Sequence, residues 1–372
     1  MVCCSLEAWD NVWRRNQFFV RELLALRSRM RLLFVEPPVD VLWSALRTRR
    51  VAGSGIRDVP GYDRLAALTP RKWLPRVVSP GVDERLGRVV QSHASRLGLT
   101  RPVLWVNDSG YAGLAERCGW PAVYDVTDDW TLAERSDRET RRQADNDRRM
   151  LAVAAEVVVC SPALAATRGA ARPVRLIPNG VDTEHFRMMQ PRPADLPPAR
   201  TILYSGTAAP DRLDIGLCVE LGTSLPDDAK LVFVGPNACS HDVTERLVKA
   251  GVIFLGARPY ADMPAYMQHA EVIVVPHVVS AFTESLDPIK AREILAVGRP
   301  AVSTPVAGFR GIGGPVETVN RSEFTATVLR ALAGSPGPGP GPAAVLGTSQ
   351  SWAARSVEFL AALEAAAATR AG

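Results

Sequence analysis

The feature that most constrains the fold is the alternation of short apolar runs with longer amphipathic segments along the chain. The runs are continuous in Val, Leu and Ile, which is typical of parallel strands buried on both faces. We predict strands at residues 32–35, 103–107, 122–125, 157–160, 175–177, 201–205, 230–235, 252–255, 272–276 and 300–304. Helical patterns stand between them, for example at 11–29, 84–97, 211–221, 243–250 and 289–297. This alternation, present in both halves, predicts two α/β doubly wound parallel sheets.

A Pro-rich stretch at 191–198 separates the two sets of strands. Proline interrupts regular structure there, just before the strand predicted from residue 201. We therefore predict an N-terminal Rossmann-like domain over 1–182 and a C-terminal one over 183–333, facing each other across a cleft. In such sheets, ligands bind beyond the carboxyl ends of the strands.

The end of the chain has a different composition. Pro and Gly alternate over 336–342, which predicts a linker over 334–350. An Ala-rich helix follows over 351–372, with Ser351 placed as its N-cap. We expect this helix to pack back near the N-terminal domain.

Composition excludes several classes of protein. In 372 residues, 47% are hydrophobic and 22% charged, so the chain can build a core and is not disordered. No stretch reaches the roughly 18 apolar residues of a membrane-spanning helix. The N-terminus shows no signal-peptide pattern, and the six cysteines have no CxxC spacing. These features predict a cytoplasmic protein without disulfides or a zinc site.

The net charge of +5 arises from the first half of the chain. Basic clusters at 47–50 and 71–76 lie beside Trp43 and Trp73. Such a mixture favours contact with an anionic membrane surface, here the inner face, or with an acidic acceptor. The alternative is an ordinary arginine-rich surface. Nucleic acid is not among the predicted partners.

The most informative segment runs from Phe282 to Pro300. Asp287 is a good N-cap, and Pro288 is favoured as a first helical residue. Gly298 then ends the helix. The free N–H groups at its start, near Ile289, make a natural phosphate site at the carboxyl edge of a sheet.

Lys290 and Glu293 lie three residues apart, so both project from one face of this helix. A cation beside the phosphates and a carboxylate one turn deeper suit a nucleoside diphosphate. Lys290 would bind phosphate, and Glu293 the ribose diol. The alternative is an ordinary surface Lys–Glu pair on a capped helix.

Other residues after strands favour the same ligand. Gly206 follows the strand at 201–205 and allows backbone to approach a ligand closely, while Arg212 would reach a diphosphate. His277 and Arg258 follow two other predicted strands. Neither GxGxxG nor GxxxxGK[ST] occurs in the chain, which argues against NAD and ATP sites.

In the first half, Asp125, Asp128 and Asp129 crowd one strand end. Such carboxylates include candidates for a general base, with Asp128 preferred, or for a metal ligand. The metal alternative is weak because no His is nearby in sequence. Asp128 or Asp129 would otherwise cap the following helix.

The segment from residue 9 to 17 is polar and aromatic for the first strand-to-helix loop. Trp9, Asp10, Arg14 and Arg15 would line an acceptor site there. The alternative is packing between the domains.

Several of these segments together resemble GT-B nucleotide-sugar glycosyltransferases, in particular the bacterial group similar to glycosyltransferase family four (group 1). The resemblance covers nearly the whole chain. It is most specific at residues 177–186, 204–214, 256–260 and 283–302. It implies a GT-B fold, a donor held by the C-terminal domain and an acceptor held by the N-terminal domain. It also implies that the enzyme needs neither a metal nor another cofactor.

The chain departs from that family at one motif. The family's pair of glutamates eight residues apart appears here as Ser285 and Glu293, so only the second is kept. Under inversion, Asp128 would be the acceptor base. Under retention, it would only position the acceptor.

The predicted function is therefore transfer of a hexose-type sugar from a nucleoside diphosphate sugar, such as a UDP-sugar, to an acceptor hydroxyl. A polysaccharide, a lipid-linked saccharide and a secondary metabolite are all open as acceptors. The alternatives are a nucleotide-sugar epimerase of the same fold and a catalytically idle GT-B partner subunit.

Overall fold

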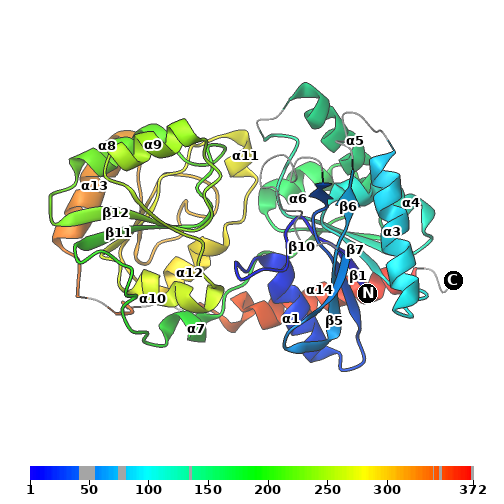
Figure 1. Ribbon diagram of the computed structural model, residues 1–372. Helices are drawn as coiled ribbons and strands as arrows, with labels where there is room; N and C mark the ends of the chain where they lie inside the picture. Colours follow the sequence, from blue (N-terminus) through cyan, green and yellow to red (C-terminus); the bar gives the residue numbers. More distant parts are fainter. Residues whose placement is uncertain (42–54, 74–80, 134–135, 338, 343–345, 370–372) are drawn as a thin grey trace. The chain divides into compact units, whose positions relative to one another are not determined.

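The computed structural model describes residues 1–372 apart from 42–54, 74–80, 134–135, 338, 343–345 and 370–372. The chain divides into two compact units (Figure 1). Unit 1 comprises residues 1–10, 14–178 and 355–372, and unit 2 comprises residues 11–13 and 179–354. Each unit has an α/β fold built on its own sheet.

The sheet of unit 1 has eight strands in the order β10-β9-β8-β7-β1-β2-β5-β4. Its strands are β1 (Val2–Cys4), β2 (Leu32–Val35), β4 (Gly55–Val59), β5 (Tyr62–Thr69), β7 (Leu104–Val106), β8 (Ala122–Val126), β9 (Glu156–Val159) and β10 (Arg175–Leu176). All pairings are parallel except β4 with β5, which form an antiparallel hairpin. A separate parallel pair joins β3 (Val39–Asp40) to β6 (Arg71–Lys72).

Helices cover both faces of this sheet. The described helices of unit 1 are α1 (Arg15–Leu26), α3 (Val82–Arg96), η1 (Ser109–Tyr111), α4 (Ala112–Arg117), α5 (Asp137–Val153), α6 (Pro162–Gly169) and most of α14 (Trp352–Ala368). One core cluster joins the strands to α3, α4, α5 and α6. On the other face, Phe359 of α14 stacks on Phe19 of α1 and contacts Trp105.

The sheet of unit 2 is parallel throughout, in the order β13-β12-β11-β14-β15-β16. Its strands are β11 (Arg200–Ser205), β12 (Ala229–Val234), β13 (Ile253–Gly256), β14 (Val272–Val275), β15 (Ala301–Ser303) and β16 (Val316–Thr318). The order places β11 and β14 side by side in its middle, although their first pair of partners in register, Ile202 and Val272, are 70 residues apart in the sequence. A switch in strand order of this kind is where open α/β sheets bind ligands.

The helices of unit 2 also cover both faces of its sheet (Figure 1). They are α7 (Thr183–Arg187), α8 (Ile215–Ser224), α9 (His241–Lys249), η2 (Tyr260–Asp262), α10 (Met263–Gln268), α11 (Ala281–Glu284), α12 (Ile289–Val297), α13 (Arg321–Ala333) and η3 (Thr348–Gln350). One core cluster packs α8, α9 and α13 against the strands, and a second packs α7, α10 and α12.

Arg299 forms hydrogen bonds between the Pro-Gly segment predicted as a linker and the rest of unit 2. Arg299 is buried and donates to the carbonyl oxygens of Ala270 at 2.7 Å, Gly337 at 2.6 Å and Pro336 at 3.2 Å. A guanidinium satisfies several backbone acceptors at once, so it holds a segment that has no regular structure of its own. Farther on, Ser351 caps α14 by accepting a bond from the Ala354 N–H at 3.1 Å.

Three details of the sequence prediction are wrong. The antiparallel strands β4 and β5 were missed. Asp287 is not the N-cap of α12, because Pro288 takes that place without a side-chain cap bond. Neither Asp128 nor Asp129 caps the helix that follows, because the cap of α5 is Ser136.

The basic clusters of the sequence prediction fall largely outside the described residues. Trp43, residues 47–50 and Arg76 all lie there. Of the rest, Trp73 is 62% exposed, and Lys72 forms an ion pair with Asp40 at 3.4 Å. No helix of the described residues is both long enough and apolar enough to cross a membrane.

Candidate functional site

The carboxyl edge of the unit 2 sheet brings together the end of β11 and the start of α12. Gly206 directly follows β11 and has a φ of +134°, a conformation that favours glycine. A Cβ atom at this position would lie 2.5 Å from the Lys290 Nζ. The missing side chain therefore makes room for the Lys290 ammonium group.

Lys290 is held by an aromatic residue rather than by an acid. Its Nζ lies 4.4 Å from the centre of the Tyr204 ring and 3.4 Å from the Tyr204 hydroxyl. Within the described part of the chain, no carboxylate lies within 4.0 Å of this ammonium group. Burial and the neighbouring Arg212 lower the pKa of Lys290 to about 7, and Glu293, one turn along α12, opposes that shift. A cation that forms no ion pair with a carboxylate is suited to an anionic ligand.

His277 adds a second polar group at this edge. It follows β14, is 4% exposed, and its Nε2 has no hydrogen-bond partner among the described residues. Burial, with Lys290 and Arg212 nearby, holds the pKa of His277 well below its usual value. The ring is therefore neutral at pH 7, and Nε2 is left to bond a ligand.

Glu293 lies one turn along α12 from Lys290. Burial raises the pKa of Glu293 to about 7, and Lys290 opposes that shift. None of the residues the structure describes donates a hydrogen bond to its carboxylate. The Lys290–Glu293 pair is thus half-buried rather than an ordinary surface pair.

The start of α12 is fixed by a contact from far along the chain. The Asp287 carboxylate accepts a bond from the backbone N–H of Asn179 at 2.6 Å and pairs with Arg292 at 2.8 Å. The Asn179 side chain in turn donates to the Asp287 carbonyl at 2.5 Å. Asp287 is therefore engaged in positioning α12, and the helix begins at Ile289 behind Pro288 with no side-chain cap.

Three other predicted donor residues have protein partners. Arg212 pairs with Asp211 at 3.2 Å. Arg258 pairs with Asp195 at 2.5 Å and donates to the Tyr266 hydroxyl at 2.9 Å. Ser285 donates to the carbonyl of Phe282 at 2.7 Å. Among the predicted donor residues that the structure describes, Lys290 forms no ion pair and the His277 Nε2 has no hydrogen-bond partner.

The carboxyl edge of unit 1 is built from carboxylates. Asp125 is fully buried in an ion pair with Arg15 at 3.1 Å and accepts a bond from the Trp105 indole at 3.2 Å. Asp129 is held by two bonds from Arg168, at 2.8 and 2.9 Å. Although burial opposes it, these bonds keep the pKa of Asp129 below its usual value. Arg15 and Arg168 are thus each paired with a carboxylate of unit 1.

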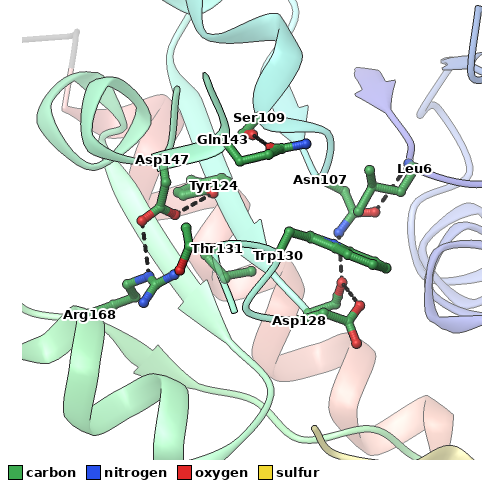
Figure 2. Close-up of a pocket in the computed structure, with 12 residues that line it drawn as sticks. Leu6, Asn107, Ser109, Tyr124, Asp128, Trp130, Thr131, Gln143, Asp147 and Arg168 are labelled. Atoms are coloured by element: carbon green, nitrogen blue, oxygen red, sulfur yellow. Dashed lines mark hydrogen bonds and ion pairs between the residues drawn. The ribbon is translucent and has the colours of Figure 1, made fainter. Parts of the chain in front are cut away.

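Asp128 has a different environment. It is half-buried, and its Oδ2 accepts a bond from the Thr127 hydroxyl at 3.1 Å. It lines a small hollow with Leu6, Asn107 and Trp130 (Figure 2). The hollow has a volume of about 20 Å³, enough for about one water molecule.

The remaining residues predicted to bind an acceptor divide into two kinds. The Trp9 ring packs edge-on against Phe34 and Tyr62, at 5.2 and 5.6 Å. Asp10 and Arg14 form an ion pair at 3.6 Å, with Asp10 46% exposed. Trp9 is therefore part of the packing of unit 1, whereas Asp10 and Arg14 lie nearer its surface.

The sequence reasoning missed Tyr204 and Asn179 as residues of the unit 2 site. Both stand inside the segments that carried the resemblance, but only the fold brings them to Lys290 and Asp287. No group of three or more His, Cys, Asp or Glu suited to a metal ion occurs among the described residues.

Residues 199–333, which contain most of the unit 2 site, match the family model described as "Glycosyl transferases group 1". This part of the chain is similar to group 1 glycosyltransferases. A protein of Bacillus subtilis (strain 168), "Putative teichuronic acid biosynthesis glycosyltransferase TuaH", is 28% identical over 230 residues. The match covers 55% of each protein, so the chain spans about half the length of this relative.

Solved structures with a similar fold match the whole length of the chain. Sucrose-phosphate synthase from Thermosynechococcus elongatus has a TM-score of 0.64 at 18% identity, with 100% of this chain and 96% of that chain covered. The UDP-forming trehalose-phosphate synthase of Burkholderia xenovorans, in complex with glucose-6-phosphate, has a TM-score of 0.56 at 11% identity, with 100% and 98% covered. The fold is therefore GT-B, as the sequence predicted.

Proposed function

We propose that this protein transfers a sugar from a nucleoside diphosphate sugar to an acceptor hydroxyl. The observation that carries the proposal is the Lys290 ammonium group beside Gly206, at the start of α12, with no carboxylate partner among the described residues. Breaking the bond to a nucleoside diphosphate leaves negative charge on the diphosphate. Catalysis of this step requires fixed positive potential at that point.

Each residue of the unit 2 site would have its own role in binding the donor and stabilising the diphosphate. Lys290, the first-turn N–H groups of α12 and Arg212 would stabilise the diphosphate, and the neutral His277 would donate a hydrogen bond to it. Glu293, one turn deeper, would accept bonds from the ribose hydroxyls. With this set of donors the proposed reaction proceeds without a divalent cation or another cofactor.

The acceptor side of the proposal rests on unit 1. Asp128 would accept the proton of the acceptor hydroxyl if the reaction inverts, and would position that hydroxyl if it retains. The teichuronic acid relative supports a cell-envelope saccharide as acceptor class. The proposed location is cytoplasmic, at the inner face of the membrane where such an acceptor is carried.

The proposal is tested first by nucleotide binding. Thermal-shift measurements with UDP, GDP, TDP and their sugars should show stabilisation by one of the three nucleotide families. Lys290→Ala and Glu293→Ala should each weaken that binding by about 10- to 100-fold, the loss expected for charge-assisted hydrogen bonds. Lys249→Ala, which removes an exposed lysine of α9 paired with Glu245, is the matched control.

Two results would contradict the proposed site. One is wild-type affinity in both Lys290→Ala and Glu293→Ala, and the other is stabilisation by none of the nucleotides. Incubation with the donor alone separates the transferase from an epimerase, because only an epimerase forms an isomerised sugar without an acceptor.

A further inference from the structure

The Glu7 carboxylate lies just beyond the end of β1 in unit 1. Glu7 is half-buried, and its backbone N–H donates to the Ser5 hydroxyl at 3.0 Å. Its Oε2 accepts bonds from Asn16 at 2.9 Å and from the Ser5 hydroxyl at 3.4 Å. Its Oε1 accepts none from the described residues.

The contact from Asn16 continues as a chain of hydrogen bonds to Asp128. Asn16 Nδ2 donates to Asn107 Oδ1 at 2.9 Å, and Asn107 Nδ2 donates to the Thr127 hydroxyl at 3.3 Å. Thr127 in turn donates to Asp128 Oδ2 at 3.1 Å, and Figure 2 shows this last part of the chain. Glu7 and Asp128 are therefore linked by one chain of hydrogen bonds.

The direction of this chain is fixed at both amides. Asn16 Nδ2 donates to the Ser5 hydroxyl at 2.8 Å as well as to Glu7, and Asn107 accepts from the Leu6 N–H at 3.3 Å and donates to the Asp125 carbonyl at 3.0 Å. An amide presents its NH₂ group to an acceptor and its oxygen to a donor. Because Glu7 accepts from Asn16, the NH₂ group of Asn16 faces the chain, and its Oδ1 is left buried without a partner among the described residues. The Asn107 oxygen then faces Asn16, so its NH₂ group faces Thr127. The Thr127 hydroxyl is left to donate to Asp128.

The unpartnered oxygen of Asn16 is not explained by stability alone. Asn16 is 1% exposed and Asn107 5% exposed, and burying polar groups costs free energy unless every group is bonded. Apolar residues of similar size would fill the same space without the unpartnered Asn16 oxygen. The chain therefore points to a role for Asp128 that depends on how its carboxylate is held.

We infer that Glu7 is a positioning residue for Asp128, acting through Asn16, Asn107 and Thr127 to orient the Asp128 carboxylate toward the acceptor hydroxyl. This role rests on the proposed function, since Asp128 faces an acceptor only if the protein is a transferase. The coupling between the two carboxylates is a property of unit 1 by itself.

The charges around Glu7 give this coupling a measurable signature. Burial raises the pKa of Glu7 to about 7, Arg14 opposes the shift, and Asp128 and Asp125 add to it. Cys3, on the neighbouring β1, is buried and has a strongly raised pKa, so it carries no charge at pH 7. Glu7 thus keeps its proton up to near-neutral pH, and Asp128 contributes to this shift.

The first test needs no substrate. Carboxyl-¹³C glutamate is incorporated, and the wild-type protein is titrated by NMR with Glu7→Gln to identify the Glu7 signal. We expect a midpoint near 7 for Glu7 and a lower midpoint in Asp128→Asn, because a neighbouring negative charge has been removed. Asp147→Asn is the control, since Asp147 bonds Tyr124 and Arg168 outside the chain.

The second test separates positioning from a merely structural role. With the donor and acceptor found by screening, Glu7→Gln and Thr127→Val should lower kcat/KM for the acceptor about tenfold, the size expected from one lost hydrogen bond. Nucleotide affinity should stay unchanged, and the step near pH 7 in the acceptor-side pH profile should disappear in Glu7→Gln.

A Glu7 midpoint that does not respond to Asp128→Asn overturns the coupling. Coupling without any transfer in the wild type overturns the proposed function and the acceptor role, but leaves the coupling. Transfer that is unchanged in both Glu7→Gln and Thr127→Val overturns the positioning role.

Discussion

The two α/β units differ in how the ionisable groups at the carboxyl edges of their sheets are paired. In unit 2, Lys290 and His277 lie where no described carboxylate pairs with them. In unit 1, Asp125 and Asp129 are neutralised by Arg15 and Arg168. Lys290 and His277 at the unit 2 edge thus form no ion pair with a described carboxylate, whereas Asp125 and Asp129 at the unit 1 edge are each paired with an arginine.

This difference separates charges that stabilise the fold from charges that await a ligand. In a buried ion pair such as Arg15–Asp125, each charge compensates the other. Removing one residue leaves the other charge buried without compensation, which lowers the free energy of unfolding. Lys290 forms no ion pair with a described carboxylate, and burial and Arg212 lower its pKa. Removing Lys290 should therefore cost the fold little stability and the ligand much of its binding affinity. The predictions below test this contrast.

The largest effect should come from Arg15→Ala in unit 1. The change leaves the fully buried Asp125 carboxylate without its cation, which should lower the free energy of unfolding by about 3–5 kcal/mol. Urea unfolding measures this loss. Arg88→Ala, an exposed residue of α3, is the control and should stay within about 0.5 kcal/mol of wild type.

Nucleotide binding in the folded Arg15→Ala protein should equal that of wild type, since Arg15 belongs to unit 1. A loss below about 1 kcal/mol would show that the Arg15–Asp125 pair is not a principal stabilising contact.

The next effect should come from Gly206→Ala in unit 2. A Cβ atom would lie 2.5 Å from the Lys290 Nζ and would displace this ammonium group. We expect nucleotide affinity, measured by calorimetry, to fall at least about tenfold, in addition to about 1–2 kcal/mol of lost stability from the left-handed conformation. Gly251→Ala separates the two effects.

Gly251 also has a positive φ, of +88°, but among the described residues the atom nearest to an added Cβ is the Gly222 carbonyl oxygen, at 3.8 Å. The control should therefore lose similar stability and keep its nucleotide affinity. Equal affinity in Gly206→Ala and Gly251→Ala would contradict the role of Gly206.

The smallest effect concerns pH. Because the pKa of Lys290 is lowered to about 7, its ammonium group loses its proton as pH rises through 7, well before an ordinary lysine. A diphosphate prefers the protonated form, so its affinity should fall several-fold, up to about tenfold, between pH 6 and pH 8. Binding should take up protons over the same range.

Calorimetry in two buffers of different ionisation enthalpy measures the proton uptake. Lys290→Gln should bind more weakly at pH 6 and lose this part of the pH dependence. An unchanged pH dependence in Lys290→Gln would assign the titration to another group, with Glu293 as the first candidate.

The sequence predicted local features of the site with accuracy. It placed α12 at 289–297, as observed, and it ended that helix at Gly298, which is in the left-handed conformation. It placed Gly206, His277 and Lys290 after strands or at a helix start. These features depend on neighbours along the chain, namely apolar runs, proline and glycine.

The prediction failed where a distant residue took over a local role. Asp287 has the composition of an N-cap, but Asn179, 108 residues away, binds its carboxylate. Asp129 looked like a cap and is bound by Arg168, 39 residues away. The β4–β5 hairpin was missed because its outer strand, β4, is mostly exposed and lacks an apolar run.

The order of residues along the chain was enough to predict the two α/β sheets, the extent of α12 and the charged residues near strand ends. Which of these charges are paired, and which are left for a ligand, depends on the folded arrangement of distant segments. The reason is that an ion pair or a hydrogen-bond chain forms between atoms that meet in space. Arg15 meets Asp125 across 110 residues of sequence, and Glu7 is joined to Asp128 only through side chains from three separate segments.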